Sequence, residues 1–86
     1  MKNNTLKIFS GRSNPALAKN IASTLNKELG KISVQTFADG EIWVKYEENI
    51  RGCDVFIIQS TNGPSENIME LALLIDAAVR ASADTV

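Results

Sequence analysis

The sequence contains no histidine, one cysteine and two prolines among its 86 residues. Without histidine the chain lacks the commonest metal ligand and the commonest general base near neutral pH, so a zinc centre within these residues is excluded. The lone Cys53 cannot form an internal disulfide, which is typical of a cytoplasmic protein. No run approaches the roughly 20 apolar residues of a membrane span, and the start, MKNNTLKIFSG, is too poor in apolar residues for a signal peptide.

The charge balance and the length set further limits. Nine basic and ten acidic residues leave a net charge of −1, which argues against a nucleic-acid partner and against binding to an anionic membrane surface. The hydrophobic fraction of 44% is ordinary for a globular protein. Eighty-six residues make at most one domain. A chain of this length hides only a little over about 60% of its unfolded surface, so its core is small.

Apolar patterning predicts an alternation of strands and helices. Asn14-Pro15 is a helix start, because the asparagine side chain can cap a free N–H and proline fits the first turn. Asp39-Gly40 is a hairpin signal between two alternating runs. The expected elements are a strand at 6–10, a helix from Pro15 to a stop at Gly30, hairpin strands at 32–37 and 42–47, a strand at 54–60 and a helix from about 66 to 82.

The same patterning predicts which faces build the core. The continuous apolar strand DVFIIQ, at 54–59, is typical of a strand covered on both faces by helices. Met69 and the leucines around it are assigned to the core. The two helices are expected to bury apolar faces formed by Leu17, Ile21, Leu25 and Leu29, and by Ile68, Leu71, Ile75 and Val79.

The order strand, helix, hairpin, strand, helix favours an α/β fold with a mixed or mostly parallel sheet flanked by helices. The last residues, 83–86, look like a loop that enters a further strand. We therefore interpret residues 1–86 as the first part of a longer α/β domain.

The predicted hairpin turn contains the main candidates for ligand-binding residues. Phe37, Asp39 and Glu41 place a flat ring and two carboxylates around Gly40. A ring can stack on a purine, and a carboxylate can accept a hydrogen bond from an exocyclic amine. Composition alone favours a solvent-exposed hairpin tip. Arg51, after a second turn, could bind phosphate through its planar fork or be a solvated turn residue.

Several blocks of the sequence, taken together, resemble ribose-phosphate pyrophosphokinases, also called phosphoribosyl pyrophosphate synthetases. The chain has neither of the familiar glycine-rich nucleotide motifs, so the resemblance depends on these blocks and their spacing. The blocks are KIFSGRSNPALA at 7–18, FADGEI at 37–42, EENIRGCDVFIIQST at 47–61, NIMELALLIDA at 67–77 and RASAD at 80–84.

The resemblance implies an activity and an assembly. Members of this family transfer the terminal diphosphate of ATP to the C1 hydroxyl of ribose 5-phosphate, giving phosphoribosyl pyrophosphate and AMP. They need Mg²⁺ and usually inorganic phosphate as activator, and ADP acts at a regulatory site. Each subunit has two similar domains of the phosphoribosyltransferase type, and dimers assemble into homo-hexamers. Our chain would then hold an incomplete phosphoribosyltransferase-like domain, a mostly parallel sheet flanked by helices with a β-hairpin flap.

The resemblance also implies roles for individual residues. Phe37 would stack on the adenine of ATP bound to a neighbouring subunit, Asp39 and Glu41 would contact the base or its surroundings, and Gly40 would permit the turn. A regulatory phosphate or ADP site would use three further residues, Asn49, Arg51 and Ser82. Asn49 stands where the family has a serine, and Ala38 also replaces a serine.

The remaining family machinery is expected beyond Val86, so the 86-residue chain alone is expected to be inactive. The family's metal-binding, catalytic and ribose-phosphate residues all fall in that later part. Two other hypotheses stay open. The chain could be a non-catalytic module that docks onto full-length synthetase subunits, or an unrelated small α/β nucleotide-binding domain.

Overall fold

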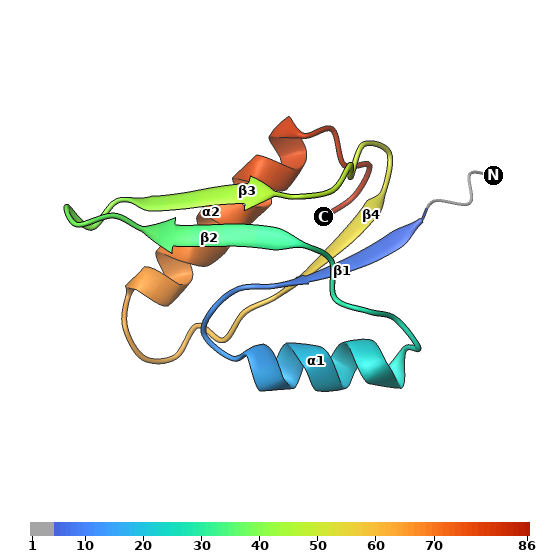
Figure 1. Ribbon diagram of the computed structural model, residues 1–86, viewed down its shortest axis with the longest axis horizontal. Coiled ribbons are helices and arrows are strands. Elements are labelled where there is room, and N and C mark those ends of the chain that lie inside the picture. The colour runs from blue at the N-terminus through green and yellow to red at the C-terminus, as the bar shows by residue number, and fades with distance from the viewer. Residues whose placement is uncertain (1–4) are drawn as a thin grey trace.

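The computed structural model describes residues 5–86, which form four strands and two helices (Figure 1). The order along the chain is the predicted one: strand, helix, hairpin, strand, helix. The elements are β1 (Leu6–Ser10), α1 (Pro15–Thr24), β2 (Ile32–Thr36), β3 (Ile42–Tyr46), β4 (Asp54–Ile58) and α2 (Glu66–Arg80).

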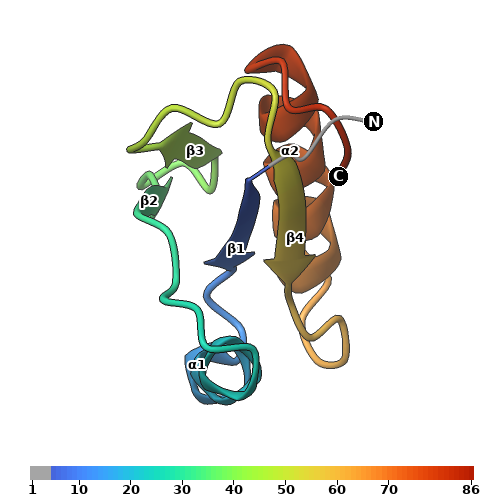
Figure 2. The same cartoon turned by 90° about the vertical axis from the view of Figure 1, so that its right-hand side faces the viewer.

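The strands form a parallel pair and an antiparallel hairpin. β1 pairs with β4 in parallel, from Leu6 opposite Asp54 to Ser10 opposite Ile58. β2 pairs with β3 in the antiparallel hairpin that the sequence predicts. Figure 2 shows the hairpin strands nearly end-on beside the upright parallel pair, so the two sheets cross. Thr85 forms an isolated parallel bridge with Asp54 of β4. The predicted α/β class, with a parallel sheet, a hairpin and flanking helices, is confirmed.

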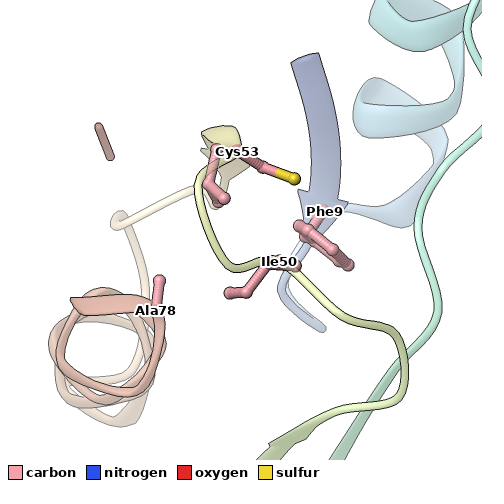
Figure 3. Close-up of a cluster of buried hydrophobic side chains, with 5 residues drawn as sticks. Phe9, Ile50, Cys53 and Ala78 are labelled. Carbon is pink, nitrogen blue, oxygen red and sulfur yellow. The ribbon is translucent and has the colours of Figure 1, made fainter. Parts of the chain in front are cut away.

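The core lies where β1, the β3–β4 connection and α2 meet (Figure 3). Phe9 and Ala78 are fully buried, and Ile50 and Cys53 close the cluster from the turn before β4. Cys53 is therefore a packing residue, as expected.

Tyr46 ties the hairpin to this core. Its ring meets the ring of Phe9 edge-on, with centroids 4.8 Å apart and an interplanar angle of 87°. Its hydroxyl donates a hydrogen bond of 2.8 Å to the carbonyl oxygen of Leu74 in α2. Burial disfavours the charged phenolate and raises the pKa of Tyr46 to about 12. The hairpin therefore packs on both β1 and α2 through one side chain.

An ion pair fixes the start of the hairpin to β1. The Lys7 ammonium donates to the Glu48 carboxylate, and the backbone N–H of Lys31 donates to the other carboxylate oxygen at 2.7 Å. The hydrogen bond from Lys7, and then that from Lys31, lower the pKa of Glu48. The same bond to Glu48 raises the pKa of Lys7.

The predicted leucine face of the first helix is wrong. The predicted cap is present, because Asn14 Oδ1 accepts from Leu17 N at 3.1 Å. The helix nevertheless ends at Thr24, since Asn26 turns the chain with φ of 55°. Leu17 and Leu25 are exposed. The fully buried positions of α1 are the small Ala18 and Ala22, and Leu29 instead bridges to β1.

The predicted core face of the second helix is also wrong. Leu74 and Ala78 are buried, whereas Ile68, Ile75 and Val79, which were expected inside, are exposed. The buried face of α2 differs from the predicted one because the helix packs against both β3 and β4 rather than across one continuous sheet.

Two further residues that were predicted to be buried are exposed. Phe56 of β4 is 55% exposed, so that strand is not covered on both faces. Met69 is 59% exposed and is not part of the core. No helix within residues 5–86 has the length and apolar character to cross a membrane.

Candidate functional site

The hairpin tip, residues 37–41, is a tight turn stabilised by its own backbone. Phe37 N donates to Glu41 O at 2.8 Å, and Gly40 N donates to Phe37 O at 2.9 Å. Gly40 adopts φ of 89°, which a residue with a side chain would reach only with strain. Asp39 Oδ1 accepts a hydrogen bond of 3.0 Å from Glu41 N. The predicted turn is confirmed, and one carboxylate oxygen of Asp39 is used to hold it.

The tip projects at one end of the longest axis of the molecule, away from the core (Figure 1). The Phe37 side chain is 47% exposed there, and Asp39 and Glu41 are exposed beside it. One flank of the tip faces an apolar groove of about 490 Å³. The groove is lined by Gly40, Glu41 and Ile42 of the hairpin and by Ser65, Glu66, Met69 and Leu73 of α2 and the residue before it. The tip therefore offers an aromatic ring and two carboxylates outside the body of its own chain.

The three residues expected at a regulatory site also lie together, at the other end of β3. Asn49 Oδ1 accepts from Arg51 N at 3.0 Å, which closes the turn before β4. Gly52 N donates to Ser82 O at 2.9 Å, so this turn contacts the end of α2. Asn49, Arg51 and Ser82 are all exposed. The fold thus brings together residues that are 31 positions apart along the chain, from Arg51 to Ser82.

A third cluster, which the sequence did not predict, lies at the carboxyl ends of β1 and β4. Glu70 of α2 is only 3% exposed. Its Oε2 accepts from the backbone N–H of Arg12 at 2.7 Å and from Gln59 Nε2 at 3.0 Å. Its Oε1 accepts from Arg12 Nε at 2.7 Å and lies 2.7 Å from Arg12 Nη2 in an ion pair. Both oxygens of this buried carboxylate are therefore paired.

Gln59 extends the cluster across the ends of the parallel strands. Its Oε1 accepts from Ser13 Oγ at 2.7 Å, and the same Ser13 oxygen accepts from Ser60 N at 2.8 Å. Gly11 leaves the room that this arrangement needs, because a Cβ there would lie 2.1 Å from Gln59 Oε1. No buried side-chain nitrogen or oxygen within residues 5–86 is left without a partner.

The cluster has a sequence signal that could have found it. Polar residues follow both parallel strands directly, as Gly11-Arg12-Ser13 and as Gln59-Ser60. The carboxyl ends of adjacent parallel strands lie at one edge of a sheet, where polar groups meet. Glu70, inside the apolar stretch IMELALL, was the other signal, because a carboxylate on a buried helix face needs a partner.

The comparisons with known proteins place the chain in a family. A model of the N-terminal domain of ribose phosphate pyrophosphokinase matches residues 6–86. The chain belongs to the ribose-phosphate pyrophosphokinase family. It is 58% identical to ribose-phosphate pyrophosphokinase 2, chloroplastic, of Spinacia oleracea over 98% of its own length and 22% of that protein. It is 57% identical to ribose-phosphate pyrophosphokinase of Bacillus subtilis over 94% of its own length and 26% of that protein.

The structural comparison agrees. The fold superposes on the crystal structure of phosphoribosylpyrophosphate synthetase from Mycobacterium smegmatis with a TM-score of 0.90 and 39% sequence identity. The match covers 94% of this chain and 28% of that one. The chain thus corresponds to the N-terminal domain region of this family and spans about a quarter of the length of these relatives.

Proposed function

We propose that this segment supplies the adenine-contacting hairpin of a ribose-phosphate diphosphokinase, an enzyme of nucleotide biosynthesis. In the reaction, the terminal diphosphate of ATP passes to the C1 hydroxyl of ribose 5-phosphate, giving phosphoribosyl pyrophosphate and AMP. Membership of the family supports the reaction. The half-exposed ring of Phe37 at the hairpin tip carries the assignment of the hairpin, because an exposed aromatic face is a stacking platform for a base.

The charges beside the ring fit the exocyclic amine of adenine. Glu41 presents an exposed carboxylate next to the ring, and Asp39 is held in place by its bond to Glu41 N. A carboxylate accepts hydrogen bonds only, so it suits a base edge that donates. The tip points away from its own core (Figure 1), which supports a base bound on a neighbouring subunit of a homo-oligomer such as a hexamer.

The test is substitution of Phe37 in a full-length enzyme that carries this segment. Phe37→Ala should raise the KM for ATP, because losing a base–aromatic stack costs about 1–3 kcal/mol, or roughly ten-fold in affinity. The KM for ribose 5-phosphate should stay nearly unchanged. Phe37→Tyr keeps the ring and should keep the KM. Trp43→Ala, which removes another exposed aromatic from the same hairpin, is the matched control. Equal effects on both substrates would instead assign Phe37 to folding or assembly.

We also propose that Asn49, Arg51 and Ser82 bind the regulatory phosphate or ADP. Their proximity supports this, since Gly52 N bonds to Ser82 O and holds the two segments together. The Arg51 guanidinium would bind a phosphate group through two parallel bonds. The Asn49 amide would donate where the family has a hydroxyl, because its Oδ1 already accepts from Arg51 N.

Activation by phosphate and inhibition by ADP test this second site. Arg51→Ala should weaken either response while leaving maximal turnover largely intact. Arg51→Lys keeps the charge without the fork and should restore the response only in part. Lys19→Ala, which removes an exposed cation from α1, should change nothing. A collapse of turnover with an unchanged phosphate response would contradict the assignment.

We propose Mg²⁺ as the cofactor of the full enzyme but assign no magnesium ligand to this segment. Within residues 5–86, no group of three or more Asp, Glu, Cys or His side chains is placed to hold a metal ion. The buried free thiol of Cys53 fits a reducing compartment, and we place the enzyme in the cytoplasm on that basis.

A further inference from the structure

The guanidinium group of Arg12 joins two distant parts of the chain. Nε donates to Glu70 Oε1 at 2.7 Å, and Nη2 lies 2.7 Å from the same oxygen in an ion pair. Nη2 also donates to Thr36 Oγ1 at 2.8 Å. Glu70 lies in α2, and Thr36 is the last residue of β2. Arg12 itself follows β1 directly. One side chain thus connects a helix of the core to the hairpin.

The end of this connection at Glu70 is rigid. The Glu70 side chain is 4% exposed, and its second oxygen is held by Arg12 N and by Gln59. A buried carboxylate with both oxygens paired has one orientation, because any other leaves a polar group unsatisfied. The Arg12 side chain is 45% exposed, so without Glu70 its position would be open to many rotamers. Glu70 therefore fixes where the guanidinium points.

The other end of the connection is the base of the hairpin tip. Thr36 pairs with Ile42 in the last rung of the hairpin ladder, and Phe37 follows Thr36 directly. Beyond that rung the tip is held by its own turn bonds. Within the part of the chain that the structure describes, the Arg12–Thr36 bond is the only side-chain hydrogen bond that joins residues 35–41 to a residue outside the hairpin.

We propose that Glu70, Arg12 and Thr36 form a strut that positions the hairpin tip for the nucleotide. The inference rests on the proposed function of Phe37. A tip already held at its base loses less conformational freedom when a ligand binds, so the strut raises affinity for ATP without touching it. Arg12 and Thr36 are then positioning residues, and the bond between them sets how well Phe37 is oriented.

Two substitutions of Thr36 isolate the bond in a full-length enzyme that carries this segment. Thr36→Val keeps the branched shape and removes the hydroxyl, whereas Thr36→Ser keeps the hydroxyl. Thr36 is exposed, so neither change disturbs the core. We expect Thr36→Val to raise the KM for ATP about two- to ten-fold, the range of one net hydrogen bond. The KM for ribose 5-phosphate should not follow, and Thr36→Ser should match the parent enzyme.

Amide hydrogen exchange without nucleotide gives a readout that does not depend on activity. Thr36→Val should speed exchange at the Phe37 and Gly40 amides, whose bonds close the tip, and leave unchanged the Glu47 amide, which is hydrogen-bonded at the opposite end of the hairpin. Thr36→Ser should leave all three at parent rates. Arg12→Lys keeps the charge but cannot span both acceptors, so it should behave as Thr36→Val does.

The outcomes separate the strut from the function on which it rests. If Thr36→Val and Thr36→Ser give the same KM for ATP and the same exchange at the tip, the strut is overturned. The same holds if Thr36→Val lowers the thermal midpoint and raises both KM values together. If Phe37→Ala leaves the KM for ATP unchanged, the proposed role of the hairpin fails, while exchange at the tip still decides whether the strut exists.

Discussion

Removing the side chain of Arg12 should destabilise the fold more than neutralising its partner, Glu70. Arg12→Ala leaves a carboxylate that is 4% exposed without its guanidinium. Glu70→Gln removes the charge instead, and the guanidinium, which is 45% exposed, can turn to water. The asymmetry follows from burial, because an unpaired charge costs far more inside a protein than at its surface.

The hydrogen bonds of Glu70 determine how much stability each variant should lose. Breaking a buried ion pair from one side costs about 3–5 kcal/mol. Arg12→Ala should lie near the lower end, because the Arg12 backbone N–H and Gln59 still donate to Glu70 Oε2. In Glu70→Gln the amide oxygen can take the Oε2 position, and the amide NH2 then replaces Oε1 and cannot accept from the guanidinium. The charged bonds lost in this way are worth about 1.5–3 kcal/mol. The double variant should cost little more than Glu70→Gln alone.

Urea unfolding of the 86-residue chain and its three variants measures these differences. A core this small has little reserve stability. The series should therefore be run cold, with the same concentration of a stabilising osmolyte for every variant. Thr36→Val belongs in the series, since Arg12→Ala also removes the bond to Thr36. Its small effect is subtracted only when the two single variants are compared, because the bond to Thr36 is lost in both Arg12→Ala and the double variant and therefore cancels from the coupling between Arg12 and Glu70.

Two results would refute the reasoning. If Glu70→Gln lowers the free energy of unfolding as much as Arg12→Ala does, the carboxylate is not a buried charge that depends on Arg12. If the two single changes simply add in the double variant, the guanidinium and the carboxylate do not stabilise each other. A coupling of about 1.5 kcal/mol or more is expected for groups in direct contact within one network.

Three other predictions concern stability and activity. Tyr46→Phe should cost about 1 kcal/mol, the worth of a typical hydrogen bond, and should reduce the loss of stability that the parent shows from pH 10 to about 12, where the unfolded tyrosine ionises before the folded one; the raised pKa of Lys7 leaves part of that loss in place, and urea unfolding at pH 9 and pH 11 measures both effects. Glu48→Gln should remove part of the acid sensitivity, because the lowered pKa of Glu48 contributes stability that is lost as pH falls through the folded value; a parallel acid titration by circular dichroism would contradict this if the two curves coincide. The isolated chain should form no AMP from ATP and ribose 5-phosphate, since it spans only 22% of the length of its spinach relative, and turnover clearly above a blank would disprove that.

Local patterns predicted the elements well because the signals for starts and turns act over a few residues. Asn14 caps α1 through a bond to a residue three positions on, and Gly40 makes its turn within the hairpin. The helix faces were predicted less well. A spacing of four shows that a helix has an apolar stripe, but which stripe is buried depends on what lies against it. Ala18 and Ala22 are buried in α1 while Leu17 is exposed.

The candidate sites also differ in whether the sequence alone could identify their residues. The hairpin and regulatory residues were assigned through the resemblance to a family, and the structure adds that Asn49, Arg51 and Ser82 lie close together. The cluster around Glu70 had no such guide. Its partner Arg12 is 58 positions away, and no periodicity links a turn after one strand to the middle of a distant helix.

Glu70 also shows why an unexplained polar residue in an apolar stretch should be followed to its partners. A carboxylate at a buried helix position is costly unless it is paired, so its presence predicts a cation or several donors from elsewhere in the chain. Here those donors come from the ends of the two parallel strands, and one of them, Arg12, reaches on to the base of the hairpin. The residue that looks most out of place in α2 therefore leads to the contact that holds the tip. In the strut that we propose, the orientation of Phe37 depends on a side chain 33 positions further along the chain.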